Sequence, residues 1–153
     1  MVNKELKNAF TKKMKINIDT ITRASKELIG NIIRTPTIRS QHLSSEINGE
    51  VFLKLENLQY TSSFKVRGAY TSITRLKEEQ KKMGVIAMSA GNHAQAVAWW
   101  AKKERVNATI VMPEHAPLFK VMKTKSLGAD VILRGRTLNE SQTYVTKLVN
   151  DKK

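Results

Sequence analysis

The apolar positions of this chain recur first at helical spacing and later as short runs separated by helical segments. A first helix is predicted with Asp19 as its N-cap and an end near Arg34, because Thr35 precedes a proline and is pushed toward extended backbone. A short helix follows, capped by Ser40 and extending through Ile47. Residues 1–17 are predicted to form a basic lead, and residues 18–153 one domain.

A turn at Asn48-Gly49 separates this part from a predicted strand, Val51–Leu55, and a polar loop, Glu56–Ser63. The next segment has one apolar helical face, made of Val66, Ala69, Tyr70, Ile73 and Leu76. From here strands alternate with helices: strand Val85–Met88, helix Ala94–Lys103, strand Ala108–Met112, helix Pro117–Leu127, strand Asp130–Leu133 and helix Leu138–Val149.

This alternation predicts the α/β class, with a parallel sheet flanked by helices and right-handed crossovers. Ligands of such sheets bind beyond the carboxyl ends of the strands. The loops expected at that edge are Glu56–Ser63, Ser89–His93, Pro113–Ala116 and Arg134–Thr137.

Composition adds one unusual feature, a net charge of +14 from 27 Lys and Arg against 13 Asp and Glu. The lysines are dispersed and are not interleaved with aromatic residues, so we favour solvated helix faces over nucleic-acid binding. A missing acidic partner chain would also explain the imbalance. The chain has no cysteine, no membrane-spanning apolar stretch and no metal-binding pattern, and a cytoplasmic location is expected.

Two segments carry candidate chemistry. Lys65 lies at the start of a predicted helix, where the helix dipole and partial burial would favour a neutral, nucleophilic amine. The segment Ser89-Ala90-Gly91-Asn92-His93 follows a strand and opens a helix, whose free N–H groups suit an anion. Taken separately, Lys65 reads as a surface lysine and the second segment as an ordinary capped turn.

Together, Ser63-Phe64-Lys65-Val66-Arg67-Gly68-Ala69 and Ser89-Ala90-Gly91-Asn92-His93-Ala94-Gln95 resemble the threonine/serine dehydratase family of pyridoxal 5'-phosphate (PLP) enzymes, related to the tryptophan synthase β chain. Further matches in the same order are Thr35-Pro36, Lys54-Leu55-Glu56-Asn57-Leu58-Gln59, Met112-Pro113 with Ala116-Pro117, and Gly128-Ala129-Asp130-Val131. The resemblance runs from about Ile18 to the C-terminus and corresponds to the small domain of that fold, with most of the large domain absent.

The resemblance implies a role for each matched residue. Lys65 would hold PLP as a Schiff base and shuttle the α-proton, Phe64 would pack on the cofactor ring, and Asn92 would bind its 3-hydroxyl. Ser89, Ala90, Gly91, Asn92 and His93 would cradle the substrate carboxylate. The implied reaction deaminates L-threonine to 2-oxobutanoate and ammonia, or L-serine to pyruvate, within amino-acid metabolism that includes isoleucine biosynthesis.

The sequence departs from the family pattern in three ways. Ser62 stands where the family usually has glycine, Ala96 stands where glycine is common, and no glycine-rich loop for the PLP phosphate is present. We therefore expect the chain to be inactive alone and to act as a homo-oligomer or with a complementing C-terminal chain. Two alternatives are a non-catalytic fragment that binds a partner, and a serine racemase-like enzyme. Racemases carry a second acid/base serine where this chain has Ala90, which favours dehydration.

Overall fold

The structure, a computed structural model, describes residues 16–151. In chain order the elements are α2 (Ile18–Leu28), β1 (Thr37–Arg39), α3 (Gln41–Glu46), β2 (Phe52–Lys54), the 3-10 helix η1 (Glu56–Leu58), α4 (Lys65–Thr74), α5 (Glu78–Met83), β3 (Val85–Met88), α6 (Asn92–Lys103), β4 (Ala108–Met112), α7 (Leu118–Ser126), β5 (Asp130–Leu133) and α8 (Leu138–Asp151).

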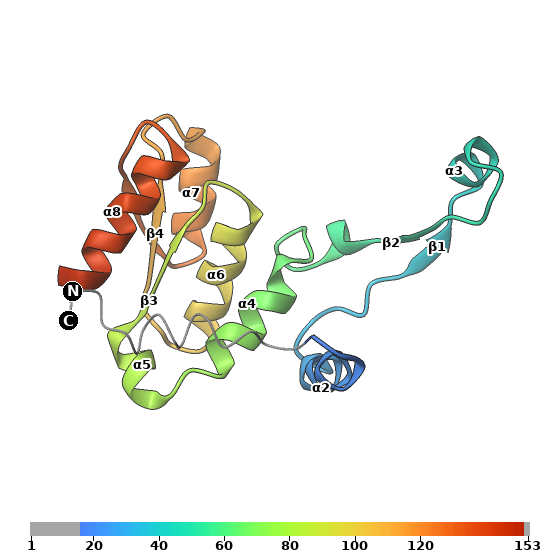
Figure 1. The fold of residues 1–153 in the computed structure, drawn as a ribbon, viewed down its shortest axis with the longest axis horizontal. Helices are drawn as coiled ribbons and strands as arrows, with labels where there is room; N and C mark the ends of the chain where they lie inside the picture. The colour runs from blue at the N-terminus through green and yellow to red at the C-terminus, as the bar shows by residue number, and fades with distance from the viewer. Residues whose placement is uncertain (1–15, 152–153) are drawn as a thin grey trace.

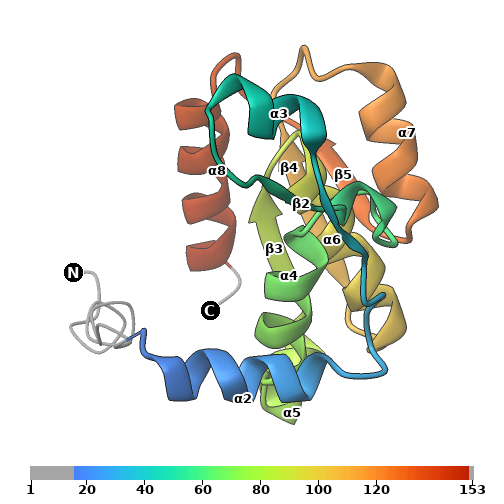
Figure 2. The same ribbon diagram turned by 90° about the vertical axis from the view of Figure 1, so that its right-hand side faces the viewer.

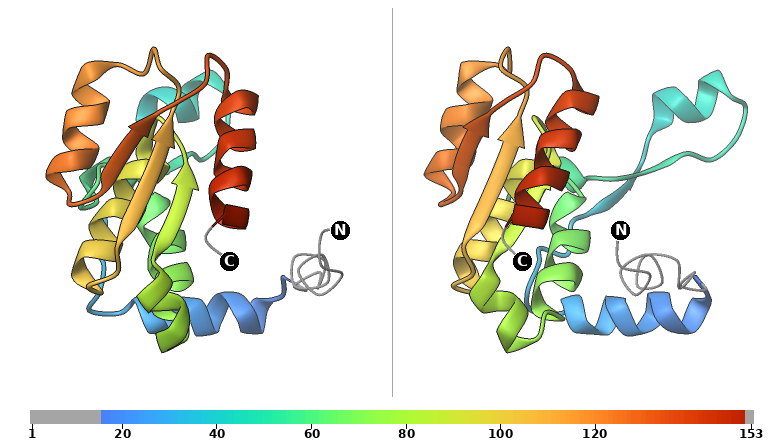
Figure 3. Two further views of the ribbon diagram at one scale, coloured as in Figure 1. Left: turned by 90° about the vertical axis from the view of Figure 1, so that its left-hand side faces the viewer. Right: turned by 60° about the vertical axis from the view of Figure 1, so that its left-hand side comes forward.

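The body of the molecule is a three-stranded parallel sheet in the order β3-β4-β5. Helices α6 and α7 cover one face of the sheet and α8 the other, and α4 packs beside α6 (Figure 1). Figure 3 shows the three strands side by side with α8 at the β3 side of the sheet. The predicted α/β class, with a parallel sheet flanked by helices, is confirmed.

The core lies between the sheet and the helices α4 and α6. The middle strand β4 is almost fully buried, and Ile110, Val111 and Met112 have no exposed surface. On the helix side, α6 contributes a row of alanines with Val97, and α4 contributes Val66, Ala69 and Ile73. The small side chains of α6 let α4 approach closely, which fixes the position of the first turn of α4.

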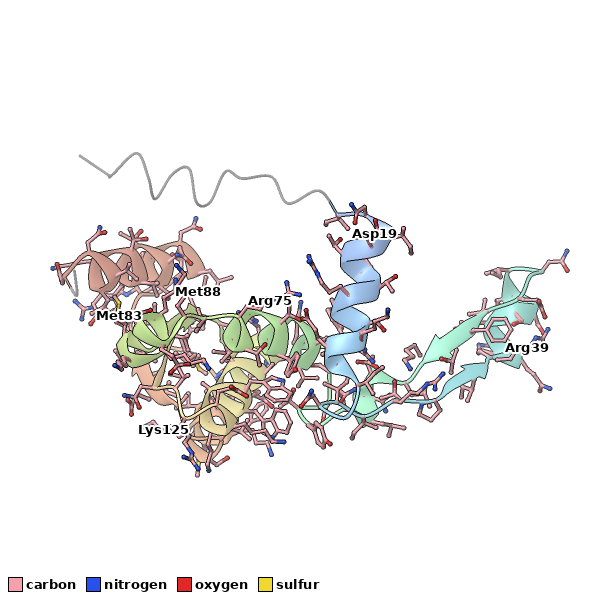
Figure 4. The ribbon with its side chains drawn as sticks, turned by 90° about the horizontal axis from the view of Figure 1, so that it is seen from below. Asp19, Arg39, Arg75, Met83, Met88 and Lys125 are labelled. Carbon is pink, nitrogen blue, oxygen red and sulfur yellow. The ribbon has the colours of Figure 1, made fainter. Side chains whose placement is uncertain are left out.

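The segment from β1 to β2 forms an arm that projects away from this body (Figure 1). Its two strands pair antiparallel, with Ile38 opposite Leu53. All residues of both strands are exposed, including the large apolar side chains of Ile38, Phe52 and Leu53. Figure 4 shows Arg39 on this arm, well away from Met88 at the end of β3. The strand expected at Val51–Leu55 therefore exists, but it belongs to the arm and not to the parallel sheet.

Several predicted boundaries were wrong. The first helix is capped by Asn17 and not by Asp19, because the Asn17 side chain and Thr20 form a reciprocal capping box. That helix ends at Leu28 and not near Arg34, since the chain turns at Gly30 with φ of +78°. Strand β1 and helix α5 were not predicted. Most of the predicted basic lead, residues 1–17, lies outside the described residues.

Candidate active site

Lys65 is the first residue of α4, directly after the loop that follows η1. Phe64 already has helical backbone angles, and its carbonyl accepts a hydrogen bond from the Arg67 amide at 3.1 Å. The Lys65 Nζ lies 4.4 Å from the centroid of the Phe64 ring, so the amine and an aromatic face are neighbours. Both side chains are exposed, so the described residues do not provide the partial burial of the amine expected from the sequence.

The second segment forms a tight turn between β3 and α6. The Ser89 Oγ accepts hydrogen bonds from the amides of Gly91 and Ala94, at 3.2 and 3.3 Å. The N-cap residue of α6 is Gly91, and the Ser89 side chain, two residues earlier, supplies a partner for the Ala94 amide in the first turn. Asn92 and His93 are the first two residues of the helix, and both side chains are exposed.

A cavity of about 590 Å³ brings part of the two segments together. Its lining comes from α4 and the residue before it, from Leu76 after α4, from β3 and from α6, and it includes Phe64, Lys65 and His93. This volume lies in the range typical of small-molecule sites. Ser89, Ala90, Gly91 and Asn92 do not line the cavity; they form the turn that leads to His93.

The electrostatics of His93 reflect this juxtaposition. Neighbouring protein atoms partly desolvate the His93 imidazole, although much of the residue is exposed, and this lowers its pKa below the usual value; the positive charge of Lys65 lowers that pKa further. The imidazole is therefore kept neutral near pH 7 beside the lysine. The predicted candidates Lys65 and His93, which are 28 positions apart in sequence, thus lie close enough to interact electrostatically.

Sequence reasoning gave no role to an ion pair that anchors the Lys65 loop. The Arg67 guanidinium donates two hydrogen bonds to the Glu56 carboxylate, at 2.8 and 2.9 Å, and the Thr35 hydroxyl donates a third at 2.6 Å. The buried Gln59 side chain also bonds both the amide and the carbonyl of Ile33. Together these bonds tie the loop before Lys65 to α4 and to the segment before β1. Glu56 and Arg67 both belong to the motifs that suggested the family, and this was the one indication in the sequence that the two residues matter.

We predict that Glu56→Gln lowers the free energy of unfolding by about 2–3 kcal/mol at pH 7. The hydrogen bonds from Arg67 lower the pKa of Glu56 to about 2, so the ionised form stabilises the fold. This stabilisation is fully present above the unfolded pKa near 4.5 and is lost as pH falls toward 2. Urea unfolding at pH 7 and pH 3 should show a large difference between the two proteins at pH 7 and a smaller one at pH 3.

The matched control is Glu50→Gln, because Glu50 forms an ion pair with Arg39 in which both side chains are largely exposed. Its effect should stay below about 0.5 kcal/mol. Equal losses in the two variants would contradict the importance of the Glu56 network.

Ser62, the position where the family usually has glycine, adopts a left-handed backbone with φ of +53°. A left-handed φ is strained for a residue with a Cβ, so the departure from glycine at this position carries a backbone cost. We predict that Ser62→Gly stabilises the protein by roughly 0.5–1 kcal/mol, since relief of strain exceeds the entropic cost of glycine. Thermal unfolding measures the change. Asn48→Gly is the control, because Asn48 has φ of +49° but asparagine tolerates that region.

The Trp99–Trp100 pair performs packing roles. The Trp100 indole is buried and donates a hydrogen bond to the Val66 carbonyl at 2.8 Å, which fastens α6 to the first turn of α4. Trp99 stacks on Tyr60, with 4.6 Å between the ring centroids, and Lys103 Nζ lies 4.4 Å from the Trp99 ring. The tryptophans thus hold both α4 and the loop that precedes Lys65 against α6.

Comparison with known proteins supports the class that the fold and these two segments suggest. The family model for pyridoxal-phosphate dependent enzymes matches residues 28–153, and the chain belongs to this family. Its cofactor is pyridoxal phosphate, as predicted. Among curated relatives, the catabolic L-threonine dehydratase of Staphylococcus aureus strain USA300 is 50% identical over 137 residues. The match covers 89% of this chain but only 40% of the relative.

Solved structures support the same family assignment. Threonine deaminase isoform 2 of Solanum lycopersicum matches with a TM-score of 0.77 and 33% identity, over 90% of this chain and 39% of that one. Maize serine racemase matches with a TM-score of 0.80 and 36% identity, over 89% of this chain and 41% of that one. The chain therefore spans about two fifths of the length of these proteins.

The residues at the cavity fit one part of PLP. An amine beside an exposed aromatic face suits the aldehyde carbon and the ring. The described part of the cavity wall offers no comparable partner for the PLP phosphate. Arg67 lines the cavity, but its guanidinium is already paired with the Glu56 carboxylate. Within residues 16–151, no helix is long and apolar enough to cross a membrane, and no group of three or more His, Cys, Asp or Glu residues is arranged for a metal ion.

Proposed function

We propose that this chain supplies the cofactor lysine and the substrate-carboxylate site of a PLP-dependent L-threonine/L-serine dehydratase. L-Threonine would lose its β-hydroxyl as water, and hydrolysis would then give 2-oxobutanoate and ammonia. The observation that carries the proposal is the meeting of Lys65, Phe64 and His93, from two separate helix starts, at one cavity. The sequence match to threonine dehydratases supports it.

The roles proposed for the residues follow from their positions. Lys65 holds the cofactor covalently through Nζ and accepts the substrate α-proton at the same atom, and Phe64 supports the ring. Asn92 binds the 3-hydroxyl, while the turn Ser89–His93 offers the carboxylate the amides of Asn92 and His93 at the helix start, since those of Ser89 and Gly91 already donate to Val111 and to Ser89 Oγ. When bound, PLP supplies an electron sink for the negative charge that develops at the substrate Cα. Because His93 is neutral, the attraction of this segment for the substrate carboxylate comes from the partial positive charge of the helix start.

A second part of the proposal concerns a partner. Activity requires a complementing chain that corresponds to the part of the S. aureus enzyme outside the match, because the described cavity wall offers no phosphate site. The exposed apolar residues of the arm are consistent with such a partner. The expected cytoplasmic location and homo-oligomer stay predictions, and the S. aureus relatives, which are named catabolic, lend no support to isoleucine biosynthesis.

A covalent-trapping experiment tests the role of Lys65 without requiring turnover. The chain is incubated with PLP, borohydride makes any bond between PLP and a lysine amine permanent, and mass spectrometry maps the labelled residues. The label should concentrate on Lys65 and fall to background in Lys65→Arg. Lys103→Arg is the control, because Lys103 is also exposed and also lies over an aromatic ring. Equal labelling of many lysines would refute the assignment.

The racemase alternative has support from the match to maize serine racemase. The methyl side chain of Ala90 cannot exchange a proton with substrate, which favours dehydration. Formation of D-serine from L-serine by the complemented protein, at a rate matching pyruvate release, would favour the racemase instead.

A further inference from the structure

The loop before Lys65 contains a backbone conformation that its own residues do not favour. Ser62 has φ of +53°, which is costly for a residue with a Cβ. The Ser62 amide donates a hydrogen bond to the Gln59 carbonyl at 2.8 Å, which closes the turn. The hydroxyls of Thr61 and Ser63 are buried, and neither has a hydrogen-bond partner within residues 16–151. These side chains therefore do not offset the strain, and another contact must hold the turn.

The Tyr60 ring provides such a contact. It stacks on the ring of Trp99, with 4.6 Å between the centroids and 24° between the planes. Trp99 belongs to α6, the helix whose first turn contains His93. Figure 2 shows α4 beside α6, with the loop that precedes α4 lying over α6. The stack thus ties the loop before Lys65 to the element that carries the other half of the candidate site.

Helix α6 also holds the chain on the other side of Lys65. The Trp100 indole donates a hydrogen bond to the carbonyl of Val66, the residue that follows Lys65. This second contact is buried in the core, whereas Tyr60 is 48% exposed. Loss of the stack should therefore leave the core intact. Because a stacked aromatic pair and one left-handed residue are comparable in energy, the stack can decide whether the strained turn persists.

We propose that the stack of Tyr60 on Trp99 holds Ser62 in its left-handed turn and thereby keeps the Lys65 amine beside His93. This inference rests on the proposed function, which gives the position of that amine its meaning. Neither aromatic residue lines the cavity, so both are positioning residues that act through Lys65. Displacement of a reacting group by a small distance is enough to slow a reaction strongly.

The test uses the full chain and follows the histidines by NMR as pH is varied. Besides partial desolvation, the charge of Lys65 lowers the pKa of His93, so this pKa reports how near the amine lies. Lys65→Met should raise the pKa of His93 and sets the full size of the effect. Tyr60→Ser should produce about half of that rise or more, because the amine is no longer held in place. Tyr60→Phe keeps a ring on Trp99 and should leave the pKa of His93 unchanged.

Two further variants examine whether the stack itself is responsible. Trp99→Ala removes the other ring and should raise the pKa of His93 as Tyr60→Ser does, with no further rise when both are combined. Phe119→Ser is the matched control, because Phe119 is 67% exposed on α7, outside the loop and the cavity. An unchanged pKa of His93 in Tyr60→Ser, or an equal rise in Phe119→Ser, would overturn the proposal.

A rescue experiment tests the link between the stack and the strained turn. Glycine adopts a positive φ without the steric cost that serine has. When Ser62→Gly is added to Tyr60→Ser, the turn no longer needs the stack, and the pKa of His93 should return toward its native value. A double variant that behaves as Tyr60→Ser alone would show that the stack does not compensate for Ser62.

Turnover gives a second readout, in the chain complemented with the part of the S. aureus enzyme outside the match. Tyr60→Ser should lower kcat for L-threonine about tenfold with little change in KM, because the turn that binds the carboxylate is kept. A raised KM with unchanged kcat would reject the positioning role. The pKa measurements need neither PLP nor turnover. Failure to trap PLP on Lys65 would therefore reject only the proposed function, and trapping with an unmoved His93 pKa in Tyr60→Ser would reject only the role of the stack.

Discussion

Lys65→Ala is expected to lower L-threonine turnover by about 10²–10⁴-fold or more in the chain complemented with the remaining part of the S. aureus enzyme. The variant loses both the amine that holds the cofactor and the atom that accepts the α-proton. The side chain is exposed and, within residues 16–151, makes no side-chain hydrogen bond or ion pair, so folding should be unaffected. Release of 2-oxobutanoate, with PLP present, is the measurement.

The design includes two comparisons. Lys103→Ala removes a lysine of similar exposure outside the cavity and should retain native turnover. The chain without its complement should be inactive. Lysine-dependent turnover by the chain alone would show that its site is complete, and this would disprove the need for a partner. Turnover that persists in Lys65→Ala would exclude Lys65 as the base.

Trp100→Ala is expected to lower the free energy of unfolding by about 3–5 kcal/mol. Trp100 is 3% exposed, and its ring packs edge-to-face against Tyr70 with 4.7 Å between the centroids. The substitution leaves a large cavity between α4 and α6 and removes the hydrogen bond to Val66. Urea unfolding followed by circular dichroism measures the change without relying on tryptophan fluorescence.

Trp99→Ala is the natural control, since it removes the same residue type one position earlier, where the ring is only partly buried. Its cost should be clearly smaller. If Trp100→Ala does not fold, Trp100→Phe should still fold with an intermediate loss. Equal losses at positions 99 and 100 would contradict the structural assignment of Trp100 as the main tie between the helices.

The parallel body could be predicted closely because its strands and helices carry strong local patterns. Strand β4 is a mostly apolar, mostly buried run, and α6 turns a row of alanines with Val97 and Trp100 toward the core. Helix α5 was missed because its six residues, Glu78–Met83, include no buried side chain to produce a periodic signal. Strand β1 was missed because it is three residues long and is defined by pairing with β2, which lies more than ten residues later.

The candidate site was predictable to a different extent. Family resemblance selected Lys65 and the Ser89–His93 turn, and the structure places Lys65 and His93 at one cavity. The burial expected around Lys65 was not found, because the side chain faces solvent in the described structure. The network of Glu56, Arg67 and Thr35 depends on the meeting of three separate segments, which no local pattern reveals.

The projecting arm has a consequence for how the chain folds as it is synthesised. The ribosome makes the arm before any strand of the parallel sheet, yet a hairpin of three-residue strands is too small to be stable alone. The β-α-β units made later enclose the buried core, to which no residue of the arm's strands belongs. The body therefore buries its core without the arm, and the apolar side chains of β1 and β2 stay exposed after the body has formed.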